Sequence, residues 1–260
     1  MKKKGLAILI AVLGVLCVVC GALLLTSQPK PATMDPTPSV SPTAEPAVQP
    51  TEEPQSSQPE TEEPYVSPID FASLQAVNPD IYGWLEIPGT EFDFPLVQRE
   101  GDDSFYLTHD SDGNESSAGA IFTESAYNST TMEDPVTVAY GHQMHAGTMF
   151  GKLQETYSQE NALEDYGEIV VYLPEKELHY QVFAAVPYDN RHILYNYDCA
   201  DPRRFNAFLN SIYEVREIGA QFNDNVAVST EDKVLVLSTC LAGNSQRRYL
   251  VLAVCQAEID

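Results

Sequence analysis

The 260-residue chain carries 38 acidic against 14 basic side chains, a formal net charge of -24, and its length allows one or two domains. This acidic balance argues against a nucleic-acid-binding protein, which needs a basic face, and against a protein that lies flat on an anionic membrane. Of the five cysteines, Cys17 and Cys20 have no second CxxC motif or histidine pair to match them, so we expect no metal site and no cofactor. Cys199 and Cys255 could form a disulfide, although no feature of the sequence favours that pairing.

A candidate membrane anchor lies close to Met1. Residues 5–25 contain no charged side chain, and such a run is long enough to cross a bilayer as a helix. Because three lysines precede it, residues 1–4 are predicted to stay in the cytoplasm. We therefore expect a single-pass anchor over residues 5–26, with the remainder extracellular at the cell membrane. A cleaved signal peptide is the alternative, but its apolar part would be unusually long and no small-x-small cleavage site follows.

A segment dominated by Pro, Thr, Ser and Glu follows over residues 27–64. It has few aliphatic and no aromatic side chains, so it cannot bury a core and is predicted to be a disordered, acidic stalk. We interpret it as a plain spacer that holds a domain off the membrane. The folded extracellular domain is predicted to span residues 65–260.

Short strands dominate the first half of this domain. Residues 68–77 are predicted to form a short helix with Phe71, Leu74 and Val77 on one face. A turn at Pro88-Gly89 follows the first strand, and the polar residues 102–114 are predicted to form a loop. The strands expected in this half cover residues 80–90, 92–96, 118–122 and 136–140.

The second half combines a hairpin, a helix and two long strands. Residues 169–173 and 178–186 are separated by hairpin spacing. Asp201-Pro202 is predicted to cap a helix that runs to about Glu217. The last two strands are predicted to be buried, because each contains an uninterrupted run of apolar residues. Many short strands, with one long helix inserted before the penultimate strand, indicate a mainly β fold that forms a closed or nearly closed barrel.

A lone cysteine follows the first of these two apolar runs. Cys240 comes after Val234–Leu237 and Ser238-Thr239, and a predicted loop separates it from Arg247 and Arg248 at the start of the last strand. A nearby positive charge favours the thiolate, which is the nucleophilic form of cysteine. The alternative is that Cys240 is a buried structural residue, the commoner role of a free cysteine.

A cysteine nucleophile needs a base, and the chain has five histidines. His142 follows a predicted strand and a glycine, in Tyr140-Gly-His142, and His145 is its near rival. The remaining histidines are expected at the surface or the polar rim of the domain: His109, His179 and His192. A single histidine is usually structural or solvated, so the pairing of Cys240 with His142 is weak by itself.

Several motifs together resemble those of the sortases, the membrane-anchored cysteine transpeptidases of Gram-positive bacteria. Val236-Leu-Ser-Thr-Cys240 is similar to the Thr-Leu-x-Thr-Cys strand end of that family, Arg248-Tyr-Leu-Val-Leu-Ala253 to its arginine-led strand, and Tyr140-Gly-His142 to its Gly-His motif. Residues 78–90, 105–110 and 119–122, with the helix from Asp201, resemble the class B branch. The sequence departs from the family at Val236, where the motif has Thr, and at Ala242, which is acidic in some class B members.

The resemblance implies a sortase-like closed β-barrel and a ping-pong acyl transfer. The implied site comprises His142, Cys240 and Arg248 as catalytic residues and Tyr140, Ser238 and Thr239 as substrate-binding residues. The cysteine would form a thioester, the histidine would move the protons, and the arginine would stabilise the oxyanion. The implied partners are secreted proteins with a C-terminal sorting signal, and an amine acceptor from peptidoglycan or from another protein.

Two other functional classes stay open. A cysteine hydrolase of the cell envelope would use the same Cys–His pair with water as the acceptor. A non-catalytic anchored binding module would instead keep Cys240 in its core. An added amine distinguishes the first alternative, because only a transpeptidase gives a ligated product, and thiol labelling at neutral pH distinguishes the second.

Overall fold

The computed structural model describes residues 65–260. The predicted anchor and stalk lie outside the described residues. Between residues 65 and 260, no helix combines the length and the apolar character that a membrane span requires. The elements are α2 (Phe71–Val77), β1 (Ile81–Glu86), β2 (Asp93–Val97), a 3-10 helix (Phe105–Leu107), β3 (Ile121–Phe122), β4 (Val136–Tyr140), α3 (Leu153–Tyr157), α4 (Ala162–Asp165), β5 (Glu168–Tyr172), β6 (Glu177–Tyr188), α5 (Ile193–Asn196), α6 (Pro202–Tyr213), β7 (Gln221–Phe222), β8 (Val234–Leu241) and β9 (Asn244–Ile259).

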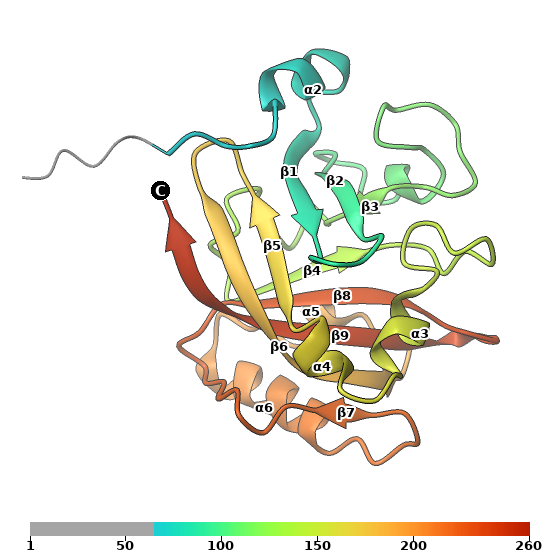
Figure 1. The fold of residues 1–260 in the computed structure, drawn as a ribbon, viewed down its shortest axis with the longest axis vertical. Coiled ribbons are helices and arrows are strands. Elements are labelled where there is room, and N and C mark those ends of the chain that lie inside the picture. Colours follow the sequence, from blue (N-terminus) through green and yellow to red (C-terminus); the bar gives the residue numbers. More distant parts are fainter. Residues whose placement is uncertain (1–64) are drawn as a thin grey trace, which may run out of the picture. The chain divides into compact units, whose positions relative to one another are not determined.

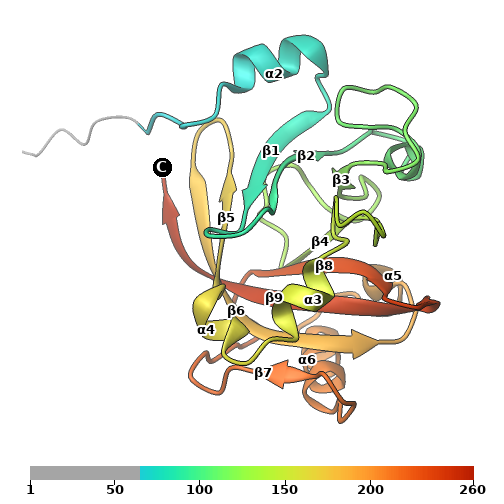
Figure 2. The ribbon, with the colours of Figure 1, turned by 45° about the vertical axis from the view of Figure 1, so that its right-hand side comes forward.

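The strands close into a barrel (Figure 1 and Figure 2). Their hydrogen-bonded order is β5-β1-β2-β3-β4-β8-β9-β6-β7, and an additional pairing of β5 with β6 closes the ring, which leaves only the short β7 outside it. Closure leaves no free edge among the strands of the ring. Neighbouring strands pair antiparallel except for β2–β3 and β4–β8, which are parallel. The predicted mainly β fold with a closed barrel is confirmed.

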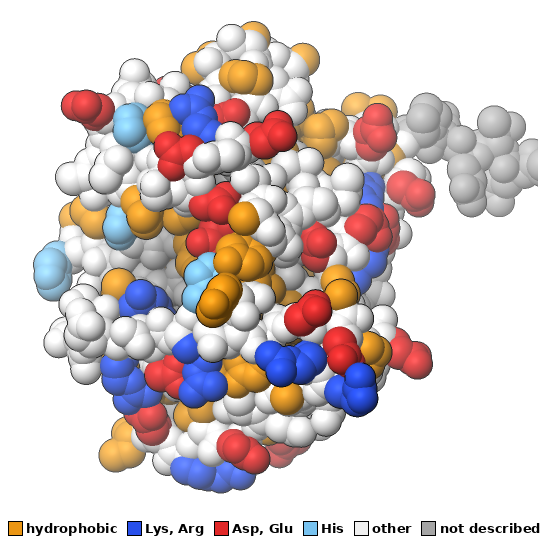
Figure 3. All heavy atoms as spheres, turned by 180° about the vertical axis from the view of Figure 1, so that it is seen from behind, with side chains coloured by type: hydrophobic (Ala, Val, Ile, Leu, Met, Phe, Trp, Pro, Cys, Tyr) orange, Lys and Arg blue, Asp and Glu red, His pale blue; other side chains and the backbone are white. Residues whose placement is uncertain are grey.

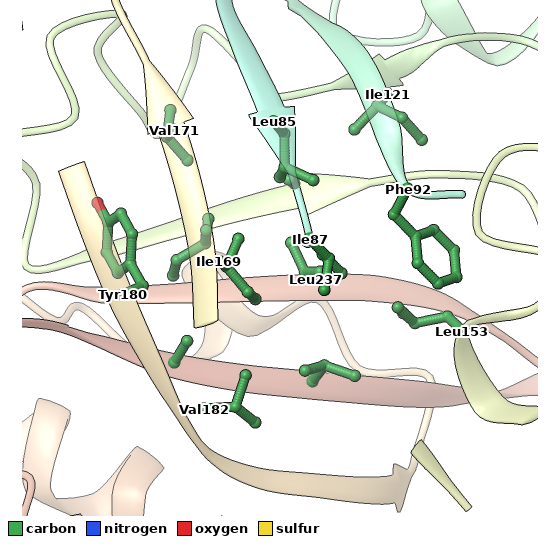
Figure 4. Close-up of a cluster of buried hydrophobic side chains, with 14 of the residues drawn as sticks. Leu85, Ile87, Phe92, Ile121, Leu153, Ile169, Val171, Tyr180, Val182 and Leu237 are labelled. Carbon is green, nitrogen blue, oxygen red and sulfur yellow. The ribbon is translucent and has the colours of Figure 1, made fainter. Parts of the chain in front are cut away.

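Apolar side chains from every strand of the ring fill the barrel. Leu85 and Val171 from one side meet Leu237 and Val251 from the other, all of them fully buried. Figure 4 shows side chains from several strands directed toward one another in this interior cluster. Because side chains alternate along a strand, the intervening residues of β4, β8 and β9 point outward. The barrel therefore has a second apolar surface on its outside.

The helix α6 covers this outer surface, below β6 in Figure 1. Its N-cap is Asp201, whose side chain accepts from the Arg203 N–H, and Pro202 occupies the first turn, as predicted. Four apolar residues on one face of the helix are buried: Phe205, Phe208, Leu209 and Ile212. Each such burial contributes about 1.5–3 kcal/mol relative to exposure.

Three sequence predictions of local structure are wrong. The long helix ends at Tyr213 rather than near Glu217, and Arg216 donates to the carbonyl oxygen of Tyr213 at its end. Val77 is 63% exposed, although helical spacing groups it with the buried Phe71. The loop predicted after Cys240 is a tight turn, because β8 continues to Leu241 and β9 begins at Asn244.

Candidate active site

The hairpin of β8 and β9 places a thiol beside a guanidinium group. Cys240 and Arg248 are direct partners in the antiparallel register, and Nη1 of Arg248 lies 3.8 Å from Sγ of Cys240. The same Nη1 donates to the backbone carbonyls of Ser245 at 3.0 Å and Arg247 at 3.2 Å, so the guanidinium group is held in place. A fixed positive charge beside a thiol favours the thiolate, and an arginine keeps its charge near neutral pH.

The other cysteines and the neighbouring arginine have different surroundings. Cys199 is buried, and burial raises the pKa of its thiol to about 12. Burial also raises the pKa of the Cys255 thiol. Both cysteines are free, so they form no disulfide in this structure. Arg247 binds the two carboxylate oxygens of Glu217 at 2.5 and 2.6 Å, which neutralises its charge. Cys240 is therefore the thiol best placed for reaction among residues 65–260.

His142 is brought to the same edge of the sheet by the parallel pairing of β4 with β8. Tyr140 lies opposite Ser238 in that pairing, and His142 and Cys240 each follow two residues later. Nε2 of His142 lies 2.8 Å from the carbonyl oxygen of Leu107. Because a carbonyl oxygen only accepts hydrogen bonds, Nε2 carries the proton in this contact. Nδ1 is then the ring nitrogen available for proton transfer.

Two glycines permit the close packing around His142. A Cβ atom on Gly141 would come within 2.6 Å of the Phe150 ring. A Cβ atom on Gly119 would lie 2.5 Å from the carbonyl oxygen of Tyr106 and 3.1 Å from Cδ2 of His142, and the φ angle of +62° at Gly119 also favours glycine. Larger residues at either position would displace the segments that hold the imidazole ring.

A groove of about 450 Å³ opens over these side chains. All six site residues predicted from the sequence line it: His142, Cys240, Arg248, Tyr140, Ser238 and Thr239. One wall includes Leu107 and Glu124, on either side of the β3 region, and the other includes His192 and Ile193, which follow β6. Figure 3 shows a hollow on the face seen from behind, with histidine and basic side chains around its rim. The groove therefore brings the predicted thiol, imidazole and guanidinium groups to one surface.

The three predicted substrate-binding residues differ in what they present to the groove. Ser238 shares a face of β8 with Cys240, because side chains alternate along the strand. Thr239 faces the other way, paired with Tyr249, and its hydroxyl oxygen is buried without a hydrogen-bond partner among the described residues. Burial raises the pKa of the Tyr140 phenol, so this group stays protonated. The role predicted for Thr239 thus has no support from its hydroxyl group.

Sequence reasoning misses three groups in the groove. The first is the backbone carbonyl of Leu107, which holds His142. The others are Glu124 and His192, whose Oε2 and Nε2 atoms are 2.8 Å apart. Burial raises the pKa of the Glu124 carboxyl group. Neither side chain has a local signal in the sequence, because each is an isolated polar residue in an irregular segment.

The remaining histidines occupy other surroundings. His145 is exposed and lines a neighbouring hollow of about 390 Å³ that also reaches Cys240. His109 stacks on the Phe105 ring with 3.8 Å between ring centroids. His179 lies between two carboxylates on β5 and β6, at 2.9 and 3.0 Å. In the described part of the chain, no group of three or more His, Cys, Asp or Glu residues is arranged to hold a metal ion.

The chain is similar in sequence to known proteins. A model of the sortase domain matches residues 85–256. The chain is 30% identical over 182 residues to sortase B of Listeria monocytogenes, and the match covers 66% of this chain and 67% of that protein. It is 27% identical over 185 residues to sortase B of Staphylococcus aureus, with 70% of this chain and 73% of that protein covered.

Solved structures of class B sortases have a similar fold. A complex of Staphylococcus aureus sortase B with a substrate has a TM-score of 0.61 at 26% identity, covering 72% of this chain and 84% of that chain. A class B sortase of Streptococcus pyogenes, involved in pilus biogenesis, also has a TM-score of 0.61 at 26% identity, with 72% of this chain and 98% of that chain covered. The predicted resemblance to class B members is confirmed by these matches.

Proposed function

Because this chain belongs to the sortase family of cysteine transpeptidases, we propose that it cleaves a C-terminal sorting signal of secreted proteins through a thioester on Cys240. The acyl group then passes to an amine of peptidoglycan or of another protein. The observation that carries this proposal is the 3.8 Å contact between the Arg248 guanidinium group and the Cys240 thiol, in a groove that His142 also lines.

Acylation starts from the thiolate. Sγ of Cys240 attacks the carbonyl carbon of the scissile peptide bond, and the carbonyl oxygen becomes an oxyanion. Arg248 stabilises this oxyanion, because its charge is permanent and two backbone carbonyls anchor its guanidinium group. At this stage His142 is the imidazolium, protonated on both ring nitrogens, and it gives its Nδ1 proton to the leaving amine as the C–N bond breaks. The products are a thioester on Cys240 and the free C-terminal fragment.

Deacylation reverses the proton transfer. An incoming amine attacks the thioester carbonyl, and the unprotonated Nδ1 of His142 accepts a proton from that amine. The C–S bond then breaks and restores the Cys240 thiolate. The Leu107 carbonyl accepts from Nε2–H in both half-reactions, so a single ring nitrogen serves as acid and then as base.

The location of the chain follows from the sequence prediction. Residues 5–26 would anchor it in the cytoplasmic membrane, with the catalytic domain outside the cell at the end of the stalk. A tethered domain meets secreted proteins as they leave the membrane. The acceptor belongs to the wall or to another protein; the similar Streptococcus pyogenes enzyme is involved in pilus biogenesis.

A peptide library tests this function on the full-length chain in detergent or membrane vesicles. The products are identified by mass, with and without an added primary amine. We expect cleavage that requires Cys240 and, when the amine is present, a ligated product in preference to the free acid. Free acid alone at saturating amine would identify a hydrolase. A Cys240 thiol that resists alkylation at neutral pH, in a chain that cleaves no peptide, would identify a binding module.

A further inference from the structure

One contact joins the two walls of the groove and has no part in the proposed chemistry. Glu124 follows β3 on one wall, and His192 lies on the other wall, in the segment between β6 and α6. Nε2 of His192 lies 2.8 Å from Oε2 of Glu124, and their side chains are only 33% and 17% exposed. The contact therefore fastens a segment that has little regular structure of its own to the barrel.

The other ring nitrogen of His192, Nδ1, makes a hydrogen bond inside the same segment. His192 is the N-cap of α5, and its Nδ1 accepts from the backbone N–H of Tyr195 at 3.1 Å. Because Nδ1 accepts, it carries no proton, and the ring proton must lie on Nε2, the atom that faces Glu124. The ring also lies against Tyr127, with 4.7 Å between ring centroids. The His192 side chain thus caps α5 and also contacts Glu124, the residue on the opposite wall that follows β3.

The fastened segment is the part of the wall that a bound peptide would meet. Asp189, Arg191 and Ile193 of this segment line the groove together with His192. Asp189 and Arg191 pair with each other, so they do not fasten the segment to the opposite wall. Loss of the contact with Glu124 would leave the spacing of the two walls less well defined.

We propose that Glu124 and His192 form a latch that fixes the width of the groove and thereby positions the peptide substrate. Both are positioning residues, because they act through the wall of the groove and not on the reacting atoms. This inference rests on the proposed function, since it concerns the peptide that the groove would bind.

Matched substitutions separate the two contacts of His192. His192→Asn keeps a good N-cap, because an asparagine oxygen also accepts from a backbone N–H, but it removes the imidazole Nε2–H that faces Glu124. Glu124→Ala removes the same contact from the other side, whereas Glu124→Gln keeps an acceptor. His179→Asn is the control, because it removes His–Glu contacts of 2.9 and 3.0 Å outside the groove.

The experiment combines steady-state kinetics with hydrogen–deuterium exchange on the full-length chain. We expect Glu124→Ala and His192→Asn each to raise KM for a cleaved peptide about three- to tenfold, the effect of one lost polar contact between side chains, with little change in kcat. The double variant should be no worse than either single variant, and Glu124→Gln should recover most of the loss. Exchange over residues 189–198 should quicken in both single variants and stay unchanged in His179→Asn.

Three outcomes would overturn the latch or its role. Unchanged exchange over residues 189–198 in Glu124→Ala would show that the contact does not hold the segment. KM effects that multiply in the double variant would show that the two side chains act independently. Faster exchange over residues 189–198 with an unchanged KM would show that the contact holds the segment but does not position the peptide. If the wild-type chain cleaves no peptide, the proposed function fails, and the exchange measurement still decides whether the latch exists.

Discussion

Replacing the two neighbouring arginines one at a time tests which of them stabilises the oxyanion. Arg248 faces Cys240 across the hairpin at 3.8 Å, whereas Arg247 binds Glu217 and the carbonyl oxygen of Tyr188. We expect Arg248→Ala to lower kcat/KM by about a hundredfold to a thousandfold, or about 2.7–4 kcal/mol, the usual loss when one oxyanion donor is removed.

Arg248→Lys distinguishes the effect of the positive charge from that of the planar guanidinium group. Nη1 of Arg248 is held by the carbonyls of Ser245 and Arg247 at 3.0 and 3.2 Å, and a single rotating ammonium group cannot reproduce this planar arrangement. Arg248→Lys should therefore recover little of the lost rate. Arg247→Ala should stay within a few-fold of wild type, because it loses a partly exposed ion pair worth roughly 0–1 kcal/mol.

The assay is the steady-state rate on one cleavable peptide for all three variants, with folding checked by thermal melts. A folded Arg247→Ala chain without activity, beside an active Arg248→Ala chain, would refute the reasoning. That result would mean that β9 is shifted by one residue relative to β8, since a one-residue slip turns every side chain of a strand to the opposite face.

Cys240→Ala should abolish cleavage, whereas Cys199→Ala should leave it largely intact because burial keeps the Cys199 thiol protonated; mass detection of the products checks both, and a folded but inactive Cys199→Ala chain would contradict the assignment. His142→Ala should be far slower than His145→Ala in the same assay, because the His142 ring is held by a backbone carbonyl whereas His145 is exposed, and equal losses would count against this choice of acid. Hydrogen bonds to two carboxylates raise the pKa of His179, so its stabilising effect relative to His179→Asn should be complete below about pH 6.5 and lost as the pH rises through the raised value. Thermal melts across this range check the sign, and a stabilising effect that grows with pH would be the opposite result.

The strands were the most predictable part of the fold, because burial on both faces leaves a local signal. The apolar run that predicts a strand over residues 136–140 coincides with β4, and the run from Val234 lies within β8. The hairpin of β5 and β6 also has the predicted arrangement. By contrast, the end of α6 depends on which residues meet the barrel surface, and helical periodicity does not reveal where that surface stops.

The site was predictable in part. Cys240 and Arg248 are close in the sequence, so the pattern of a cysteine-ended strand followed by an arginine-led strand indicates their contact. The choice of His142 needed the family motifs, because no local pattern joins β4 to β8. The contact between Glu124 and His192 could not be predicted from the sequence, since it links two irregular segments that only the closed barrel brings together.

The parallel pairing of β4 with β8 also determines the order in which the site can assemble during folding. The β8–β9 hairpin, which pairs Cys240 with Arg248, closes a very short loop and can form early. β4 precedes β8 by about a hundred residues, with β5, β6 and α6 between them, so the pairing that brings in His142 is a slow, non-local one. A folding intermediate with the hairpin alone would carry a thiol that reacts with alkylating reagents but has no proton donor beside it. In this order of assembly the thiol would gain its positive neighbour before its acid, and peptide cleavage would need the β4–β8 pairing as well as the hairpin.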